Sequence, residues 1–430
     1  MDNGQSSQLA AGYKLNFIQL IQISPLSINA FNLTFLPYFM KKKIPVMIVL
    51  MITLFSWACS KKAVIAPTTT PPQYSSVFYA WDKFSMGADL SYVNEIEDFG
   101  GIYKDSNTVK DAFTIFKNRG ANTVRVRLWH NPQWVASVTG GKLYSDLKDV
   151  EKTIRRAKAA GMAVNLDLHY SDDWADPQEQ RTPDAWKNLD MTGLKDSVYQ
   201  YTLSVLTYLK SKDLTPEMIQ VGNENNNGIL FPLGKSSNWK NFGDLLNSGI
   251  KAVRDFSKTS TIKPQIIIHV AQLQNAEYWT NNITTTGGVT DFDILGLSHY
   301  FKWSTVASLT EVGTIIKALK TKYNKKVMIV ETAYPWTAQN ADSYSNIIAG
   351  DVGISPYGVS KEEQLRYMKD LTQQVISAGG TGIMYWEPAW ISSPMKDRWG
   401  KGSSWENNAF FDFSGNALPV MDFMTYPYKF

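Results

Sequence analysis

The sequence predicts an α/β protein in which eight parallel strands and their helices close into one (β/α)8 TIM barrel. Short apolar runs alternate with amphipathic stretches about eight times, with roughly forty residues in each unit. An open doubly wound sheet is the alternative, but it would carry a Gly-rich phosphate turn after its first strand, and "MGADLSYV" offers none. No second domain is recognisable, so residues 77–430 are expected to form a single domain.

The eight strands are expected where short apolar runs are bounded by turn residues. These runs are Ser85–Leu90, Thr123–Trp129, Ala163–Tyr170, Met218–Glu224, Gln265–Val270, Ile294–Tyr300, Val327–Ala333 and Gly382–Pro388. Helical periodicity lies between them, as in Asp146–Gly161 and Lys361–Gly380, and both of these stretches end in glycine, as helix C-termini prefer. Alternation of this kind is typical of parallel strands joined by helical crossovers.

The segment before the barrel is expected to direct export. Residues 1–39 are interpreted as an over-extended gene start, because signal sequences begin at the start codon. Residues 40–59 (MKKKIPVMIVLMITLFSWAC) combine three lysines, an apolar run that is short for a membrane span, and Cys59. This pattern indicates a bacterial lipoprotein signal that ends at a lipidated Cys59. A signal peptide without lipidation and an uncleaved anchor helix stay open as alternatives. The Pro- and Thr-rich residues 60–76 are expected to be a flexible tether.

Composition limits the possible partners. The chain is 44% hydrophobic with a net charge of +4, and no basic stripe interleaves with aromatics, so a nucleic-acid partner is not expected. We expect a monomeric lipoprotein of the bacterial outer membrane, attached to the membrane only by its lipid. The sequence does not decide between the cell surface and the periplasmic face. Without lipidation it would be secreted. The 14 tryptophans could stack on sugars or fill the core.

Polar residues at the predicted strand ends are candidates for chemistry, because barrel enzymes place their active sites at the C-terminal ends of the strands. The candidates are Arg125 and Arg127 on the second strand, Asp167, His169, Asp172, Trp174 and Asp176 after the third, Asn223 and Glu224 on the fourth, His299 and Tyr300 on the sixth, Glu331 on the seventh, and Trp386 on the eighth.

The four histidines are a set that a zinc hydrolase could use. His130, His169, His269 and His299 all fall at or near predicted strand ends, but they belong to four different strands and no HxH or HExxH spacing is present. Metal catalysis is therefore not favoured, and no catalytic cofactor is expected.

A pair of glutamates at the strand ends is a better candidate for the catalytic groups than the four histidines. Glu224 and Glu331 would project into one pocket from the fourth and seventh strands, and carboxyls about 5–5.5 Å apart suit retaining glycoside hydrolysis. Glu331 would attack the anomeric carbon, and Glu224 would protonate the leaving oxygen and then activate water. Arg125 and Tyr300 would keep Glu331 ionised, and Asn223 would donate to the sugar 2-OH. One glutamate at a strand end is readily explained as an exposed charge without function. Two such glutamates, with Asn223 and Arg125 placed to match, are better explained as a catalytic pair.

Longer stretches resemble glycoside hydrolase family 53 of clan A, the arabinogalactan endo-β-1,4-galactanases. They include "VRVRLWHNP", "LDLHYSDDWADPQEQRTPDAW", "QVGNENNNGILFP", "ETAYPW" and "MYWEPAW", and the resemblance extends from Phe78 to Tyr428. It implies a retaining endo-acting enzyme that cuts the galactan side chains of pectin. The segments "SHYFKW" and "WENNAFFDF", with Asn408, depart from the family pattern and leave subsite preference open.

The resemblance also implies roles residue by residue. Glu224 would be the acid/base and Glu331 the nucleophile, with a supporting set of Arg125, His169, Asn223 and Tyr300. Candidates for contact with galactosyl units are Asp89, Arg127, Asp172, Trp174, Trp303, Trp336, Trp386 and Trp405. Two rival functions stay open: another clan A endo-glycanase, such as a mannanase or cellulase, and a glycan-binding lipoprotein without turnover.

A polar run after the seventh strand, "NADSYSN", is a candidate calcium loop. Asn340, Asp342 and Asn346 carry oxygen-bearing side chains, and Tyr344 could lend its carbonyl. The resemblance implies that a calcium here would be structural and would order the long loop. A bare polar turn stays open as the alternative.

Overall fold

The expected barrel is present in a computed structural model, which describes residues 75–430 apart from 307, 351 and 352. Eight parallel strands close in the order β1-β10-β9-β8-β7-β6-β5-β4, so the (β/α)8 prediction is confirmed. The strands are β1 Ser85–Asp89, β4 Thr123–Leu128, β5 Ala163–Leu168, β6 Met218–Val221, β7 Gln265–Ala271, β8 Ile294–His299, β9 Lys326–Thr332 and β10 Gly382–Tyr385. The predicted gene start and signal, and nearly all of the predicted tether, lie outside the described residues.

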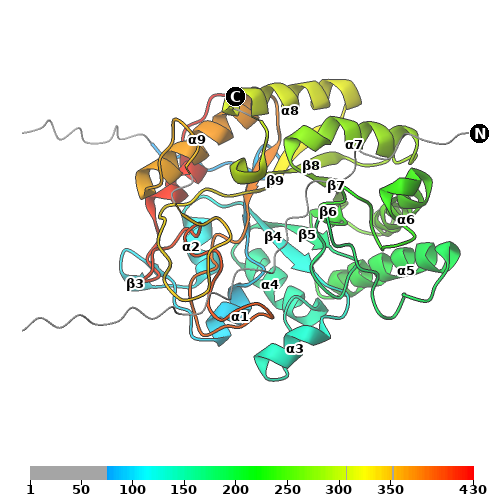
Figure 1. Cartoon of the computed structure of the whole chain (residues 1–430), viewed down its shortest axis with the longest axis horizontal. Coiled ribbons are helices and arrows are strands. Elements are labelled where there is room, and N and C mark those ends of the chain that lie inside the picture. The colour runs from blue at the N-terminus through cyan, green and yellow to red at the C-terminus, as the bar shows by residue number, and fades with distance from the viewer. Residues whose placement is uncertain (1–74, 307, 351–352) are drawn as a thin grey trace, which may run out of the picture. The chain divides into compact units, whose positions relative to one another are not determined.

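Helices surround the barrel in Figure 1. They are α1 Val93–Asp98, α2 Ala112–Asn118, α3 Gln133–Thr139, α4 Leu147–Ala159, α5 Met191–Lys210, α6 Trp239–Ser257, α7 Leu273–Thr285, α8 Leu309–Tyr323 and α9 Lys361–Ser377. Several begin at an N-cap side chain that accepts from a backbone N–H three residues later, as at Asp146, Asp190 and Ser360. Within the described part, no helix is both long and apolar enough to cross a membrane.

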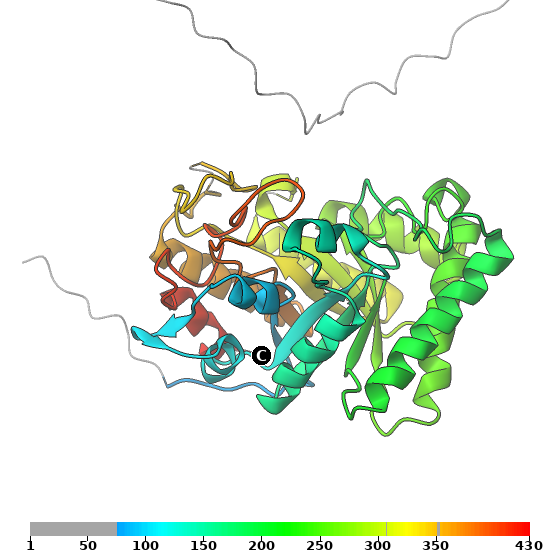
Figure 2. The same cartoon turned by 90° about the horizontal axis from the view of Figure 1, so that it is seen from below.

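Smaller elements complete the chain. A two-stranded hairpin pairs β2 Lys104–Asp105 with β3 Thr108–Val109, and short 3-10 helices lie at η1 Ser236–Asn238, η2 Phe301–Trp303 and η3 Pro419–Thr425. The loops that follow β9 and β10 lie at the same end of the barrel in Figure 2.

The interior of the barrel changes character along its axis. An apolar cluster of Met218, Ile267, Ile294, Met328, Val330 and Met384 fills one region. Toward the C-terminal ends of the strands, the buried side chains are polar and include Arg125, Asp167, Gln220 and His269. Strand register aligns these polar residues, since Asp167 pairs with both Arg127 on β4 and Gln220 on β6. A buried polar cluster at this end marks it as the place for a site.

Several strands end earlier than the sequence predicts, because the backbone turns sharply there. Tyr170 after β5, Glu224 after β6 and Glu387 after β10 adopt φ values of 50°, 45° and 45°. Residues with a side chain rarely occupy this left-handed region, and such strain gathers at functional sites. The turns therefore direct side chains over the mouth of the barrel.

Candidate active site

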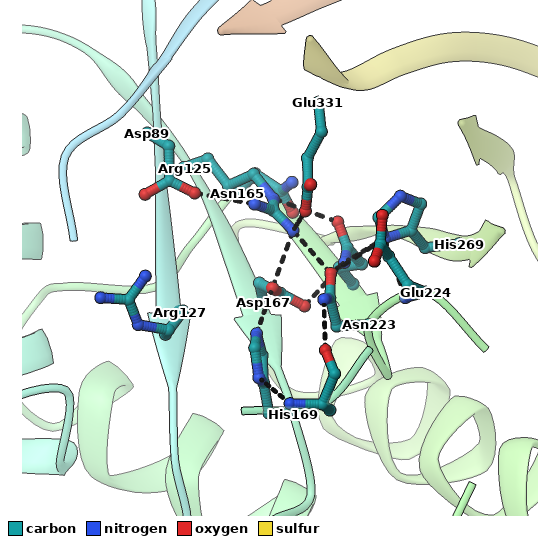
Figure 3. Close-up of polar contacts among 12 residues, drawn as sticks. Asp89, Arg125, Arg127, Asn165, Asp167, His169, Asn223, Glu224, His269 and Glu331 are labelled. Atoms are coloured by element: carbon teal, nitrogen blue, oxygen red, sulfur yellow. Dashed lines mark hydrogen bonds and ion pairs between the residues drawn. The ribbon is translucent and has the colours of Figure 1, made fainter. Parts of the chain in front are cut away.

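A buried arginine lies at the centre of the polar cluster (Figure 3). Arg125 is 1% exposed, and its guanidinium pairs with Asp89 at 2.7 Å, Asp167 at 2.8 Å and Glu331 at 2.8 Å. It also donates to Asn223 Oδ1 at 2.9 Å. Several acidic and amide acceptors around one guanidinium satisfy a charge that would otherwise be costly to bury. Arg125 thus holds side chains from β1, β5, β9 and the turn after β6 in one arrangement.

Each carboxylate oxygen of Glu331 on β9 has a polar partner, one through an ion pair and the other through a hydrogen bond. Arg125 Nη2 lies 2.8 Å from Oε1, and the Tyr300 hydroxyl donates to Oε2 at 2.8 Å. Both contacts favour the ionised carboxylate. Glu331 is 4% exposed, so its carboxylate is shielded from bulk water.

Glu224 faces Glu331 across the cluster. One carboxylate oxygen of Glu224, one of Glu331 and a ring nitrogen of His269 all lie within 4.8 Å of one another. The two glutamates therefore meet in one place although they are more than a hundred positions apart in the chain. The main hydrogen-bond donor to Glu224 is the Ser298 hydroxyl, at 2.6 Å from Oε1.

The surroundings of Glu224 and Glu331 differ, and they give the two carboxyls different pKa values. Burial raises the pKa of Glu331 to about 7, while Arg125 and the Tyr300 hydroxyl act to lower it. Burial and then the charge of Glu331 raise the pKa of Glu224 well above its usual range, and Ser298 opposes this. Because only Glu331 has a guanidinium at its carboxylate, it loses its proton first. The pair therefore offers one ionised and one protonated carboxyl.

Asn223 and His169 fill out the predicted supporting set. Asn223 donates one Nδ2 hydrogen to the Ala175 carbonyl at 2.8 Å, and among the described residues its second Nδ2 hydrogen has no acceptor. His169 lies 3.0 Å from Asp167 through Nε2, while its Nδ1 accepts from the backbone N–H of Ala175 at 3.2 Å. His169 thereby orients Asp167, which pairs with Arg125.

Three of the predicted sugar-contacting tryptophans keep accessible surface. Trp303 is 44% exposed, and Trp174 and Trp386 are half-buried. The rings of Trp174 and Trp386 lie 6.0 Å apart at the cluster's edge. Exposed indole faces can stack on sugar rings, so these three stay candidates for substrate contact.

The other predicted contacts have partners within the protein. Asp89 is fully buried and pairs with Arg125. The guanidinium of Arg127 is 4.3 Å from the Trp174 ring centroid and lies apart from the cluster in Figure 3. Buried side chains offer a sugar little surface, so their effect on substrate must pass through their neighbours.

Trp336, Trp405 and Asp172 are also engaged inside the protein. The Trp336 indole donates to the carbonyl of Glu406, and the Trp405 indole donates to that of Trp386. Asp172 lies 3.1 Å from His130 Nδ1 and accepts from a backbone N–H of the following loop. The two indoles are almost completely buried, whereas the Asp172 side chain is 24% exposed.

Two site residues, His269 on β7 and Ser298 on β8, were not singled out by the sequence for roles of their own. A signal was present for Ser298, since alternation along a strand places it on the same side as Tyr300 and opposite His299. His299 is buried, and burial lowers its pKa to about 4, so it is neutral.

The loops after β9 and β10 each contain a buried oxygen atom that lacks a hydrogen-bond partner. In the described part of the chain, no donor reaches Asn346 Oδ1 or Glu406 Oε2. Burial raises the pKa of Glu406 to about 7, and the charge of Asp342 adds to it. Asn346 Nδ2 also lies next to Asn340 Oδ1. Oxygen ligands of this kind fit a calcium ion. Glu406 was not predicted as part of this group.

Comparison with known proteins gives one consistent result. The family model described as "Glycosyl hydrolase family 53" matches residues 85–424. A protein of Cellvibrio japonicus, named arabinogalactan endo-beta-1,4-galactanase, is 46% identical over 354 residues, which cover 80% of this chain and 92% of that protein. The solved GH53 catalytic domain of Ignisphaera aggregans has a TM-score of 0.74 at 33% identity, covering 83% of this chain and all of that domain. A solved fungal beta-1,4-galactanase has a TM-score of 0.68 at 32% identity, covering 79% and 98%.

Proposed function

The chain belongs to glycosyl hydrolase family 53, and we propose that it is a retaining endo-β-1,4-galactanase acting on galactan and on the arabinogalactan side chains of pectin. The separation of the two glutamates carries the proposal, with one oxygen of Glu224 within 4.8 Å of one of Glu331. Retaining enzymes hold their carboxyls about 5–5.5 Å apart, whereas inverting enzymes need about 6.5–9.5 Å. The names of the relatives support galactan as the substrate.

The reaction follows from the two protonation states. Glu331 attacks the anomeric carbon while the bond to the leaving oxygen breaks, and that oxygen takes its electron pair and the proton of Glu224. Glu224, now ionised, removes a proton from water, whose oxygen attacks the same carbon and displaces Glu331. The second step returns both carboxyls to their starting states, since Glu331 leaves as a carboxylate and Glu224 regains a proton from water, and two inversions retain the β configuration.

The product profile on linear β-1,4-galactan tests the activity. We expect mixed oligomers early in digestion and β-anomeric reducing ends in the first NMR spectra. A single small product would indicate exo action. Cleavage of mannan or cellulose with galactan intact would select the rival endo-glycanase, and galactan binding without new reducing ends would select the non-catalytic rival.

Separate substitutions test the two glutamates. Glu331→Gln removes the nucleophile, so turnover of galactan should be lost. With Glu224→Ala, substrates bearing good leaving groups should still form the glycosyl-enzyme, because their departure needs little acid assistance. Added azide should then release β-galactosyl azide, and failure of azide to restore turnover would contradict the role of Glu224.

We also propose a structural calcium in the loop after β9, held by oxygens of Asn340, Asp342 and Asn346 and by the carbonyl of Tyr344, with Glu406 from the loop after β10 joining them. The unpartnered atoms of Asn346 and Glu406 support this site. Bound calcium would supply the positive charge that these oxygens lack. Calcium should raise the melting temperature by about 2 °C or more relative to EDTA. Glu406→Gln should remove most of that rise, whereas Glu277→Gln on exposed α7 should keep it.

For the N-terminal region we propose lipidation at Cys59 and an envelope location for a monomeric enzyme. The order of lysines, short apolar run and cysteine supports this. Labelled palmitate should be incorporated into the wild type and not into Cys59→Ser, and light scattering of the detergent-free Cys59→Ser product should give one chain per particle. Label in neither protein would favour secretion.

A further inference from the structure

We propose that His269 and Ser298 are positioning residues that determine which oxygen of Glu224 carries the catalytic proton. The inference rests on the proposed glycosidase function, in which Glu224 is the acid and base. Figure 3 shows His269 beside Glu224, on the side away from Arg127. His269 comes from β7 and Ser298 from β8, and both are completely buried.

A closed series of hydrogen bonds begins and ends on Glu224. The backbone N–H of Glu224 donates to His269 Nδ1 at 3.2 Å. On the other side of the ring, Nε2 lies 2.9 Å from Ser298 Oγ, and Ser298 Oγ lies 2.6 Å from Glu224 Oε1. The left-handed backbone at Glu224, with φ of 45°, belongs to the turn that places its N–H and its carboxyl around the same histidine.

The direction of these bonds follows from the donors at Nδ1. A backbone N–H can only donate, so Nδ1 must accept. The Gln220 side-chain amide nitrogen, 3.0 Å from Nδ1, is a second donor. The neutral ring therefore carries its hydrogen on Nε2 and donates to Ser298 Oγ. Burial and then the charge of Arg125 lower the pKa of His269 well below its usual range, which keeps the ring neutral.

One contact favours the opposite direction. Asn223 Oδ1 also lies 3.0 Å from His269 Nδ1 and could accept a hydrogen from it. However, Arg125 Nη2 already donates to this oxygen at 2.9 Å. Asn223 Oδ1 is thus satisfied without the ring, whereas the backbone N–H of Glu224 has no acceptor in the described part of the chain other than Nδ1.

This direction assigns different tasks to the two oxygens of Glu224. Ser298 donates its single hydrogen to Oε1, so the acidic proton of Glu224 resides on Oε2. No described residue donates a hydrogen bond to Oε2, which leaves that oxygen for the substrate. After the first step, the same Ser298 hydrogen stabilises the carboxylate that must take a proton from water.

Other charged groups also act on Glu224. Glu331 on β9 and Asp176 after β5 raise its pKa, whereas Arg125 on β4 lowers it, and Tyr300 after β8 lies close enough to interact with it. The substitutions below leave all four groups in place. A shift of the alkaline limb of the pH profile in these variants is therefore due to loss of the hydrogen bonds that join His269, Ser298 and Glu224.

The test is the dependence of kcat/KM on pH for the full chain with galacto-oligosaccharides. Ser298→Ala removes a donor to the ionised form of Glu224, so the alkaline limb should move to higher pH by about one unit. His269→Asn should do the same, since its short side chain cannot reach Ser298. His269→Gln retains an N–H near the position of Nε2 and should stay close to the wild type.

Ser85→Ala is the matched control, because it removes a buried serine hydroxyl, bonded to Thr123 at 2.6 Å, from the other end of the barrel. Its profile should not move. Combining Ser298→Ala with His269→Asn should give no shift beyond that of Ser298→Ala alone. An alkaline limb that moves to lower pH, or does not move, would overturn the proposal.

A measurement on the wild type covers the case in which the variants do not fold. Long-range ¹H–¹⁵N spectra of ¹⁵N-histidine-labelled protein should show His269 protonated at Nε2 and bare at Nδ1 between pH 5 and 8. A hydrogen on Nδ1 would refute the proposed direction. This result is independent of turnover, so it is distinguishable from a failure of galactan hydrolysis.

Discussion

At the nucleophile, each oxygen of one carboxylate has its own partner from a different strand. Arg125 of β4 pairs with one oxygen of Glu331, and the hydroxyl of Tyr300, which follows β8, donates to the other. These contacts act against burial, which raises the pKa of Glu331 to about 7. Loss of either contact should therefore favour the protonated, unreactive form.

Tyr300→Phe tests this balance. Without the hydroxyl the pKa of Glu331 rises further, so the acidic limb of kcat/KM should move to higher pH. At pH 6 the rate constant should fall by roughly 10- to 100-fold. Tyr170→Phe is the control, because the Tyr170 hydroxyl is bonded to Thr202. An unchanged acidic limb in Tyr300→Phe would show that the hydroxyl does not lower the pKa of Glu331.

Residue identity and strand alternation were enough to predict Arg125, Asn223, Glu224, Tyr300 and Glu331. They were not enough for Ser298 and His269, because alternation tells only which side of a strand a residue faces. Whether a hydrogen-bond series closes depends on the register of β7 against β8 and on the left-handed backbone at Glu224. Neither is encoded in a local pattern.

Among the elements, the turn after β6 explains the run of asparagines that follows Glu224. Asn226 forms two hydrogen bonds with the end of β7, accepting from the Ala271 N–H at 2.7 Å and donating to the Ala271 carbonyl at 2.9 Å. Asn227 donates to the Pro177 carbonyl in the loop after β5 at 2.7 Å. These amides replace strand pairing where β6 has ended, and they hold the turn that carries the acid/base.

Asn226→Ala should therefore affect catalysis through Glu224. Loss of the bond from the Ala271 N–H leaves that group unsatisfied, whereas the Ala271 carbonyl still accepts from Asn275, and the free energy of unfolding should fall by about 1–3 kcal/mol. We expect kcat to fall more than KM rises, because the turn positions the acid more than it binds sugar. Asn247→Ala on α6 is the control, and equal losses of kcat in both variants would contradict a specific role for the turn.

A buried ion pair connects two other elements. Arg127 on β4 pairs with Glu387 after β10 at 2.8 Å, and β1 lies between these strands in the barrel. Glu387 follows Trp386, so the pair restrains the turn that presents this ring. The resemblance implied a substrate contact for Arg127, and strand alternation could not show that Tyr92 and Trp174 would cover it.

Arg127→Met should destabilise the protein by about 3–5 kcal/mol, because Glu387 would remain buried without its partner. The double variant Arg127→Met/Glu387→Gln removes both charges and should recover part of this loss. Chemical denaturation of the two variants provides the measurement. A double variant as unstable as the sum of both single variants would show that the two side chains act independently.

On the scale of the whole molecule, buried acids link folding to pH. Burial raises the pKa of Glu95 to about 8 and that of Asp149 to about 6. Others are shifted the opposite way, and the pKa of Asp167 is lowered by Arg125 and His169 against its burial. The barrel and its core could be predicted from the sequence, but these shifts could not, since Glu95 lies on a short helix that reads as polar and exposed.

The buried acids with a raised pKa, Glu95 and Asp149, should make the protein less stable as pH rises. Between about pH 4.5 and 8 the folded state holds the Glu95 proton more tightly than the unfolded state does, so the free energy of unfolding falls with increasing pH, by at most about 1.4 kcal/mol per unit for one group. The lowered acids lose stabilisation at acidic pH, so maximal stability is expected near pH 5–6. Glu95→Gln stays neutral throughout and should flatten the decline in melting temperature from pH 5.5 to 8.5, whereas the exposed Glu277→Gln should retain the full decline. An equally steep decline in Glu95→Gln would mean that this glutamate is ionised in the folded protein over that range.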